Sequence, residues 1–236
     1  APHYRILSGS GGEREGFRIH SQFAVETEPG YLAVVSAFSP GGSRAHIPTG
    51  PATVYIGHES GPADVTRVPE VGALAREPTP FFTLDPRGIG EVRAKTCGND
   101  EFLAPYGSDY LYASTGEMLG ESLLGRRVHD ALRCLDFLRA EGVGGITLCG
   151  RGIGSITAAF AALLHPAQPK AWLMDYLPAY EDLVKADRMR WPLSALLRGC
   201  LREFDLPDLY RALRGRLTLG RAWDPQLTEL EPHGTA

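Results

Sequence analysis

Three alternating glycines form the segment of this chain whose residue types and spacing could do chemistry. Gly150, Gly152 and Gly154 follow the apolar run 146–149 and precede a run of small residues, 155–164. In Gly-x-Ser-x-Gly sites a strand, a sharp turn and a helix in this order present a serine hydroxyl to the substrate. Here the central residue is Gly152, which has no side chain. The segment therefore has the outline of a nucleophile turn without its nucleophile, and we expect Gly152 to have a positive φ.

The same glycines allow a second interpretation, in which the turn cradles a phosphate at the N-terminus of the helix. Asp175 ends the apolar run 171–174, roughly where a dinucleotide-binding fold places the acid that contacts the ribose. The third glycine of that fingerprint should fall at position 155, which is Ser155, and about four strand candidates precede the unit. A dinucleotide-binding domain is therefore a distant alternative.

The rest of the chain alternates between strand and helix patterns that could position this turn. We expect two antiparallel strands first, then further strands, one long helix, a helix after the glycine turn, a weak helix before residue 80, and two or three short helices between 180 and 216. The expected strands are 17–26, 31–38, 52–56, 80–84, 146–149, 171–174 and 217–223, and the helices 68–76, 119–141 and 155–164. This alternation predicts one α/β domain over residues 1–236, a mostly parallel sheet that ends with its seventh strand and has helices on both faces.

Composition excludes several classes of function. The chain has 236 residues, of which 43% are hydrophobic, and a net charge of −4. Such a chain can bury a substantial core, and its charge does not favour nucleic acid or an anionic membrane surface as a partner. No apolar run approaches the roughly 20 residues that a membrane span requires. The four scattered cysteines, among them Cys97 and Cys149, lack metal-ligand spacing, so we expect no metal and no cofactor, and an inert core thiol at Cys149.

Three further motifs carry a resemblance to a known family. They are Asp85-Pro86-Arg87-Gly88-Ile89-Gly90-Glu91, residues 124–130 in the long helix, and residues 204–210; with the glycine turn they cover roughly residues 50 to 225. On these motifs the chain resembles the α/β-hydrolases of the acetyl xylan esterase and dienelactone hydrolase type, and most closely the C-terminal hydrolase-like domains of bacterial proteins described as acetyl xylan esterases. The resemblance implies an α/β-hydrolase fold and a secreted or periplasmic location. It also implies an upstream hydrolase domain, or a small ligand derived from carbohydrate, as the partner.

Carried over residue by residue, the resemblance gives an incomplete catalytic set. The nucleophile position is Gly152, and the acid maps onto Asp224. Acyl transfer also needs a histidine that takes the proton of the nucleophile. After Asp224 the chain offers only His233, a weak candidate in a polar tail of the kind that usually frays.

The backbone part of such a site does not depend on these losses. The N–H of Ile153 and an N–H near His58 occupy the family's oxyanion-donor positions, so a pocket that includes His58, Ile153 and Arg87 is the candidate ligand site. His58 is nevertheless expected to be a satisfied loop histidine. We expect Arg87 to organise its loop by pairing with Glu91 or with another carboxylate.

Two neighbouring features have simpler interpretations. We expect the Ser155 hydroxyl to bond to the backbone one turn into the helix. Tyr106, Tyr110 and Tyr112 are expected to lie in a loop and to pack it, with stacking on a sugar ring as the alternative.

The residues together predict an α/β-hydrolase-like domain with a degenerate catalytic apparatus, acting as an accessory, structural or ligand-binding module. The enzyme alternative is an active carboxylic ester hydrolase, acting on carbohydrate, with a non-standard or partner-completed site. The sequence leaves open the ligand, the oligomeric state, the removal of an upstream domain or signal peptide, and whether Gly152 is natural or engineered.

Overall fold

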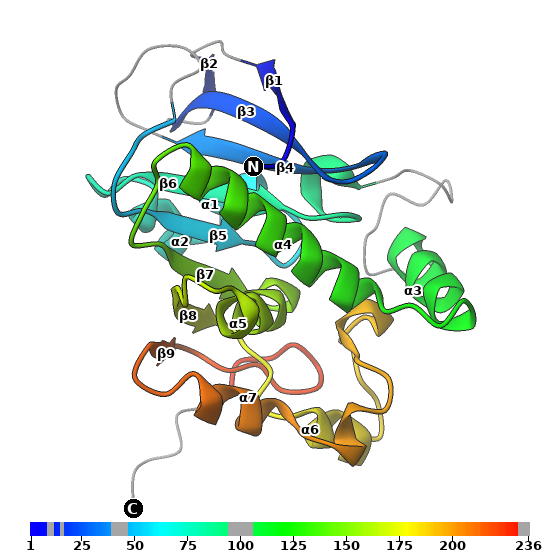
Figure 1. Cartoon of the computed structure of the whole chain (residues 1–236). Coiled ribbons are helices and arrows are strands. Elements are labelled where there is room, and N and C mark those ends of the chain that lie inside the picture. The colour runs from blue at the N-terminus through cyan, green and yellow to red at the C-terminus, as the bar shows by residue number, and fades with distance from the viewer. Residues whose placement is uncertain (9–11, 15–16, 39–46, 94–105, 231–236) are drawn as a thin grey trace, which may run out of the picture.

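A single twisted sheet organises the molecule (Figure 1). The computed structural model describes residues 1–8, 12–14, 17–38, 47–93 and 106–230. Within them the strands follow the spatial order β1-β3-β4-β6-β5-β7-β8-β9, with β2 also beside β3. They are β1 (Tyr4–Ser8), β2 (Gly12–Arg14), β3 (Phe17–Glu28), β4 (Tyr31–Phe38), β5 (Thr53–Ile56), β6 (Phe81–Asp85), β7 (Thr147–Arg151), β8 (Lys170–Met174) and β9 (Leu217–Leu219).

The two halves of the sheet differ in strand direction. Strands β6, β5, β7, β8 and β9 run parallel to one another, whereas β1, β2, β3, β4 and β6 are joined by antiparallel pairings. The predicted β3–β4 hairpin is present, and Gly30 at its tip has φ +81°, a left-handed value that glycine adopts without strain. All seven predicted strands occur, and the edge strands β1 and β2 were not predicted.

Helices cover both faces of the sheet, as predicted for an α/β chain (Figure 1). The long α4 and the adjacent α5 lie on one face, and α1 and α2 lie on the other. The helices are α1 (Gly61–Arg67), α2 (Pro69–Leu74), α3 (Ser108–Met118), α4 (Leu123–Ala140), α5 (Ile153–Leu164), α6 (Tyr180–Lys185) and α7 (Leu206–Ala212), with 3₁₀ turns η1 (Gly90–Val92), η2 (Leu193–Ala195) and η3 (Cys200–Arg202).

The buried face of the long helix α4 shows why its sequence pattern predicted a helix. Leu124, Val128, Leu135 and Leu138 recur at helical spacing and are all buried in the main core between α4, α5 and the sheet. The predicted start at residue 119 was too early, because the Ser122 hydroxyl accepts the N–H of Gly125 at 3.1 Å and begins the helix at position 123.

Two other boundaries needed correction. The aromatic segment before α4, predicted as a loop, forms α3, whose buried residues Ser108, Asp109 and Ala113 are polar or small. Its apolar residues face outward, so no core-facing stripe signalled a helix. The weak helix predicted at 68–76 is α2, and Ser60 caps an additional helix before it, α1.

No helix in the described ranges is both long and apolar enough to cross a membrane.

Candidate functional site

The glycine turn has the geometry of a sharp strand-to-helix elbow. Strand β7 ends at Arg151, helix α5 begins at Ile153, and Gly152 between them has φ +56° and ψ −122°. These angles match the first central position of a type II′ turn, which glycine dominates. The predicted positive φ at Gly152 is confirmed.

The flanking glycines let the helix approach the sheet. A Cβ on Gly154 would overlap the carbonyl oxygen of Ile56 and lie 2.6 Å from that of Gly57. A Cβ on Gly150 would in turn overlap the carbonyl oxygen of Gly154 and lie 2.7 Å from the Cα of Ser155. Because backbone atoms cannot move aside as a side chain can, both positions require glycine. The Ser155 hydroxyl donates to the Gly152 carbonyl at 2.7 Å, as expected.

The imidazole of His58 fills the space in front of the elbow. A Cβ built on Gly152 would overlap Nδ1 of His58 and lie 2.8 Å from its Cγ. The same Nδ1 accepts the backbone N–H of Ile153 at 3.2 Å. The Ile153 N–H, an oxyanion donor according to the family resemblance, is therefore already bonded to the ring that lies where a nucleophile's side chain would begin.

His58 is held as a neutral ring. It is only 5% exposed, and it meets Trp223 and Trp191 edge-to-face at centroid distances of 5.4 and 6.4 Å. Burial first, and then the positive charges of Arg151 and Arg127, lower the pKa of His58 to about 3. Since Nδ1 accepts a hydrogen bond, the proton of the neutral ring lies on Nε2, which has no hydrogen-bond partner among the described residues.

Next to the elbow, Arg151 and Asp175 are engaged with each other. The Arg151 Nε donates to Asp175 Oδ2 at 2.6 Å, and its guanidinium lies 4.7 Å from the ring centroid of Trp223. Arg221 approaches the other carboxylate oxygen of Asp175 at 3.2 Å. Asp175 itself is 2% exposed and has φ +47°. Its carboxylate thus lies between two guanidinium groups, rather than open toward a ribose.

The candidate acid Asp224 organises its own turn. Its Oδ1 accepts the N–H groups of Gln226 and Thr228, each at 2.8 Å, and its carbonyl accepts the indole N–H of Trp191 at 2.9 Å. No described histidine pairs with its carboxylate. The candidate base His233 lies outside the described residues.

Arg87 pairs with a carboxylate of α4 and not with Glu91. Its Nε and Nη2 donate to the fully buried Asp130 at 2.8 and 2.6 Å, and Nη2 lies 3.3 Å from Glu28. The guanidinium also lies 4.7 Å from the ring centroid of Tyr31. These contacts tie the loop after β6 to α4 and to the β3–β4 hairpin.

Buried Asp85 also organises this loop, a role that the sequence analysis did not predict. Its carboxylate accepts the N–H groups of Gly61 at 2.8 Å and of Glu91 at 3.0 Å, and burial raises its pKa to about 6. Gly90, at φ +52°, passes so close that a Cβ there would overlap the carboxylate. The signal was present in the sequence, since Asp85 opens the motif that ends at Glu91.

Comparison with solved structures identifies the fold. A proposed acetyl xylan esterase of Bacteroides fragilis is 17% identical over 93% of this chain and 62% of its own, with a TM-score of 0.71. Acetyl xylan esterase 1 of a Thermoanaerobacterium species is 13% identical over 90% of this chain and 66% of its own, with a TM-score of 0.52. A cold-adapted esterase from an Arctic intertidal metagenomic library is 17% identical, covers 94% and 92%, and has a TM-score of 0.51.

The chain has an α/β-hydrolase-like fold. It resembles acetyl xylan esterases in structure, as the sequence motifs implied, but it spans less than two thirds of the length of the first two of these proteins. No protein-family model matches the sequence, and no curated protein sequence matches it.

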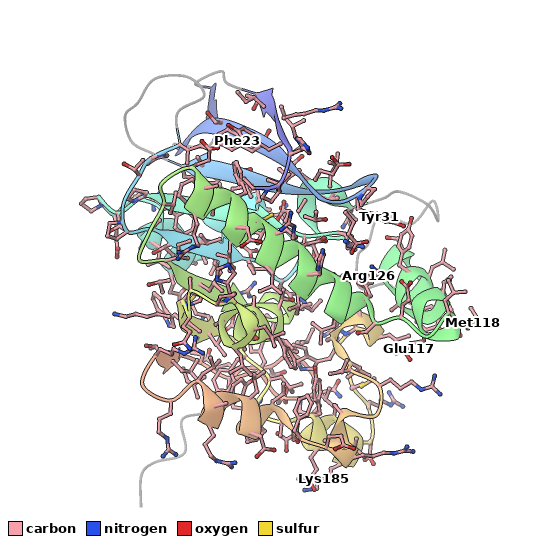
Figure 2. All side chains as sticks on the ribbon, in the orientation of Figure 1. Phe23, Tyr31, Glu117, Met118, Arg126 and Lys185 are labelled. Carbon is pink, nitrogen blue, oxygen red and sulfur yellow. The ribbon has the colours of Figure 1, made fainter. Side chains whose placement is uncertain are left out.

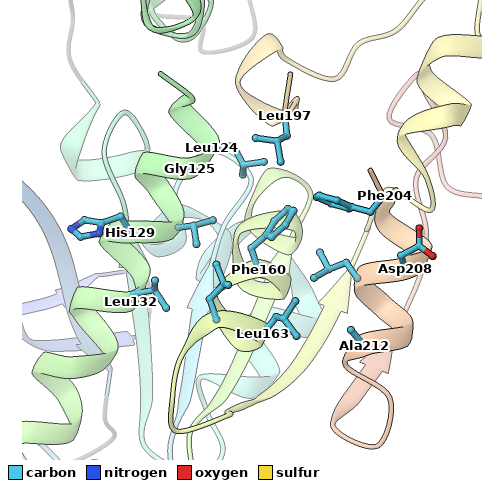
Figure 3. A pocket seen from close by; sticks show the side chains of 13 residues that line it. Leu124, Gly125, His129, Leu132, Phe160, Leu163, Leu197, Phe204, Asp208 and Ala212 are labelled. Carbon is cyan, nitrogen blue, oxygen red and sulfur yellow. The ribbon is translucent and has the colours of Figure 1, made fainter. Parts of the chain in front are cut away.

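Within this hydrolase-like fold, a polar cavity of about 520 Å³ lies beside the elbow. His58, Arg151, Arg67, Asp64 and Glu91 are among its lining residues, so it combines both signs of charge. A second hollow of about 790 Å³ lies near Asp224 and Arg221. A third hollow, of about 630 Å³, is lined almost entirely by apolar side chains. They come from α4, α5, α7 and the segment between η2 and α7 (Figure 3).

Other chemistry near the elbow is limited in the described part of the chain. Burial raises the pKa of the Cys149 thiol to about 12, which keeps it protonated and unreactive. Among the described residues no group of three or more histidine, cysteine, aspartate or glutamate side chains is placed to hold a metal ion. Cys97 lies outside them.

Proposed function

We propose that this chain is a non-catalytic module with an α/β-hydrolase-like fold, belonging to a protein of the acetyl xylan esterase type. The observation that carries the proposal is the position of His58. Its buried ring occupies the place of the missing nucleophile side chain and accepts a hydrogen bond from the Ile153 N–H.

Acyl transfer needs three elements that the residues at the elbow do not supply. It needs a nucleophile, a base near neutral pKa, and free N–H donors for the developing oxyanion. The elbow carries Gly152, the nearest imidazole has a pKa of about 3, and the Ile153 N–H is bonded. The alternative of an active ester hydrolase would require the His58 ring to leave its buried position against Trp191 and Trp223.

The accessory role is the second part of the proposal. The chain spans 62% of the B. fragilis protein that it resembles, and in this proposal it acts through a neighbouring hydrolase domain. The polar cavity beside the elbow supports a small ligand derived from carbohydrate, because carboxylates and guanidinium groups can both bond to hydroxyls.

Hydrolysis of an activated acetyl ester tests the loss of catalysis. The purified chain should give no turnover above that of a heat-denatured sample, and intact mass should show no adduct with a serine-directed phosphonate. Turnover that disappears on phosphonate labelling would overturn the proposal.

A pair of variants tests the physical reason. Gly152→Ser restores the hydroxyl but meets the His58 ring, whereas Gly152→Ser with His58→Ala also makes room and releases the Ile153 N–H. Both should remain inefficient, because the His58 ring has a pKa of about 3 in the first variant and is absent from the second, and no other described residue is placed as a base. Efficient turnover by either folded variant would reveal a base elsewhere and contradict the proposal.

Ligand binding has its own test. Calorimetric titration with xylose oligosaccharides should give heat that Arg67→Ala weakens, while Arg214→Ala, on the surface after α7, serves as the matched control. Equal binding by both variants would remove the cavity from the proposal.

A further inference from the structure

Helix α3 buries polar and small residues and exposes its large apolar ones, the reverse of an ordinary amphipathic helix. The residues that it buries are Ser108, Asp109 and Ala113, and its large apolar side chains face solvent. A surface helix normally buries its apolar face against the core. The helix projects beside the N-terminal end of α4, and Met118 lies at its outer end (Figures 1 and 2).

A buried ion pair fixes this orientation. Arg127 of α4 is fully buried; its Nη2 donates to Asp109 at 2.8 Å and its Nη1 to the Ser194 hydroxyl at 2.7 Å. Rotating α3 to bury its tyrosines would withdraw Asp109 and leave the Arg127 charge unpaired inside the protein, which is strongly unfavourable. The outward apolar face is therefore a property of the folded chain.

The exposed face is large enough for a protein interface. Six side chains on α3 and at its two ends form it: Tyr106 77%, Tyr110 43%, Leu111 45%, Tyr112 41%, Met118 78% and Leu119 74% exposed. At about 200 Å² for a large side chain, these fractions amount to roughly 700 Å². A standard interface buries about 800 Å² on each partner, and tyrosine and methionine are enriched in interfaces.

Charge argues against a membrane or nucleic acid as the occupant of this face. Neither lysine nor arginine occurs between Tyr106 and Gly125, whereas Asp109, Glu117 and Glu121 do. Helices that lie on membranes carry basic residues on the polar face. A protein partner is the class that fits.

We propose that the face made by these six residues is the site at which two copies of this chain associate about a two-fold axis. An isologous contact buries the same patch twice. Because Tyr110, Leu111 and Tyr112 are consecutive and point about 100° apart, one contact reaches only part of the roughly 700 Å², which corresponds to a small, weak interface. The patch also opposes its own copy without net repulsion, because each of its three acidic residues has a basic partner. Asp109 pairs with Arg127, Glu117 lies 3.8 Å from Arg198, and Glu121 pairs with Arg126 at 2.7 Å. This inference does not depend on the proposed loss of catalysis.

Sedimentation equilibrium of the full chain tests it. We expect a concentration-dependent dimer of twice 25.6 kDa between about 1 and 100 µM. Met118→Glu places a charge on the most exposed side chain of the face and should weaken the dimer at least about tenfold. Val184→Glu is the matched control, since Val184 is 71% exposed on α6, away from α3, and should leave the dimer unchanged.

Hydrogen exchange gives a readout that does not rely on a variant. The amides of α3 should exchange more slowly as the concentration of the wild-type chain rises, while those of α6 should not change. A wild-type chain that stays monomeric at 100 µM overturns the proposal, as does a dimer that Met118→Glu weakens no more than Val184→Glu does. Binding of the monomer to phosphatidylcholine vesicles through α3, without self-association, would also overturn it.

Discussion

Replacing Gly152 by alanine probes the elbow and the His58 ring at once. The new Cβ would stand at φ +56°, a conformation that costs a non-glycine residue about 1–3 kcal/mol. It would also overlap Nδ1 of His58 and lie 2.8 Å from Cγ, and overpacking of a core costs about 1–3 kcal/mol. If the ring moves away, the buried Ile153 N–H loses its acceptor, at about 1–3 kcal/mol.

These contributions overlap, and we expect a total loss of about 3 kcal/mol or more in the free energy of unfolding. With an m-value of about 3 kcal/mol/M, that shifts the urea midpoint by about 1 M. The matched control is Gly120→Ala, because Gly120 has φ +75° and nothing within 4 Å of a built Cβ. Gly120→Ala therefore reports the backbone cost alone, about 1 kcal/mol.

A double-mutant cycle then separates the clash from the backbone strain. In a His58→Ala background the alanine at position 152 meets no ring, so Gly152→Ala should cost markedly less there than in the wild-type background. A Gly152→Ala midpoint no lower than that of Gly120→Ala, with no coupling to His58, would show that the ring does not stand in front of the elbow.

Three further outcomes follow from the same contacts. Gly154→Val should destabilise the fold far more than Gly152→Ala, because the built Cβ meets backbone carbonyls that cannot move; denaturant midpoints that rank the other way would contradict this. Arg87→Met should cost about 3–5 kcal/mol, because it leaves a buried aspartate of α4 unpaired, whereas Lys185→Met, which breaks an exposed pair, should cost less than about 1 kcal/mol; equal midpoints would refute the difference. His58 has a folded pKa of about 3, below its unfolded value near 6.5, so its contribution is present above pH 6.5 and is lost on acidification. Between pH 7 and 5 the wild type should thus lose about 2 kcal/mol relative to His58→Asn, and parallel stability curves would contradict this.

Local signals were enough for much of the architecture. The alternation of strand and helix patterns, the glycine spacing at 150–154 and the Gly30 hairpin depend on neighbours in the chain, and the sheet, the positive φ of Gly152 and the β3–β4 pairing agree with them. The sequence also showed directly that position 152 has no side chain. Its likeness to esterases rested on motifs, and the structural neighbours support the fold that those motifs implied.

Tertiary structure alone decided what surrounds the elbow. His58 and Ile153 are 95 positions apart, and Arg87 and Asp130 are 43 apart, so no local pattern could pair them. The same holds for α3, where a buried pair between Asp109 and Arg127 overrides the rule that apolar faces turn inward. Hydrophobic periodicity records how a segment meets the core, whereas long-range polar pairs depend on where the fold brings distant segments together.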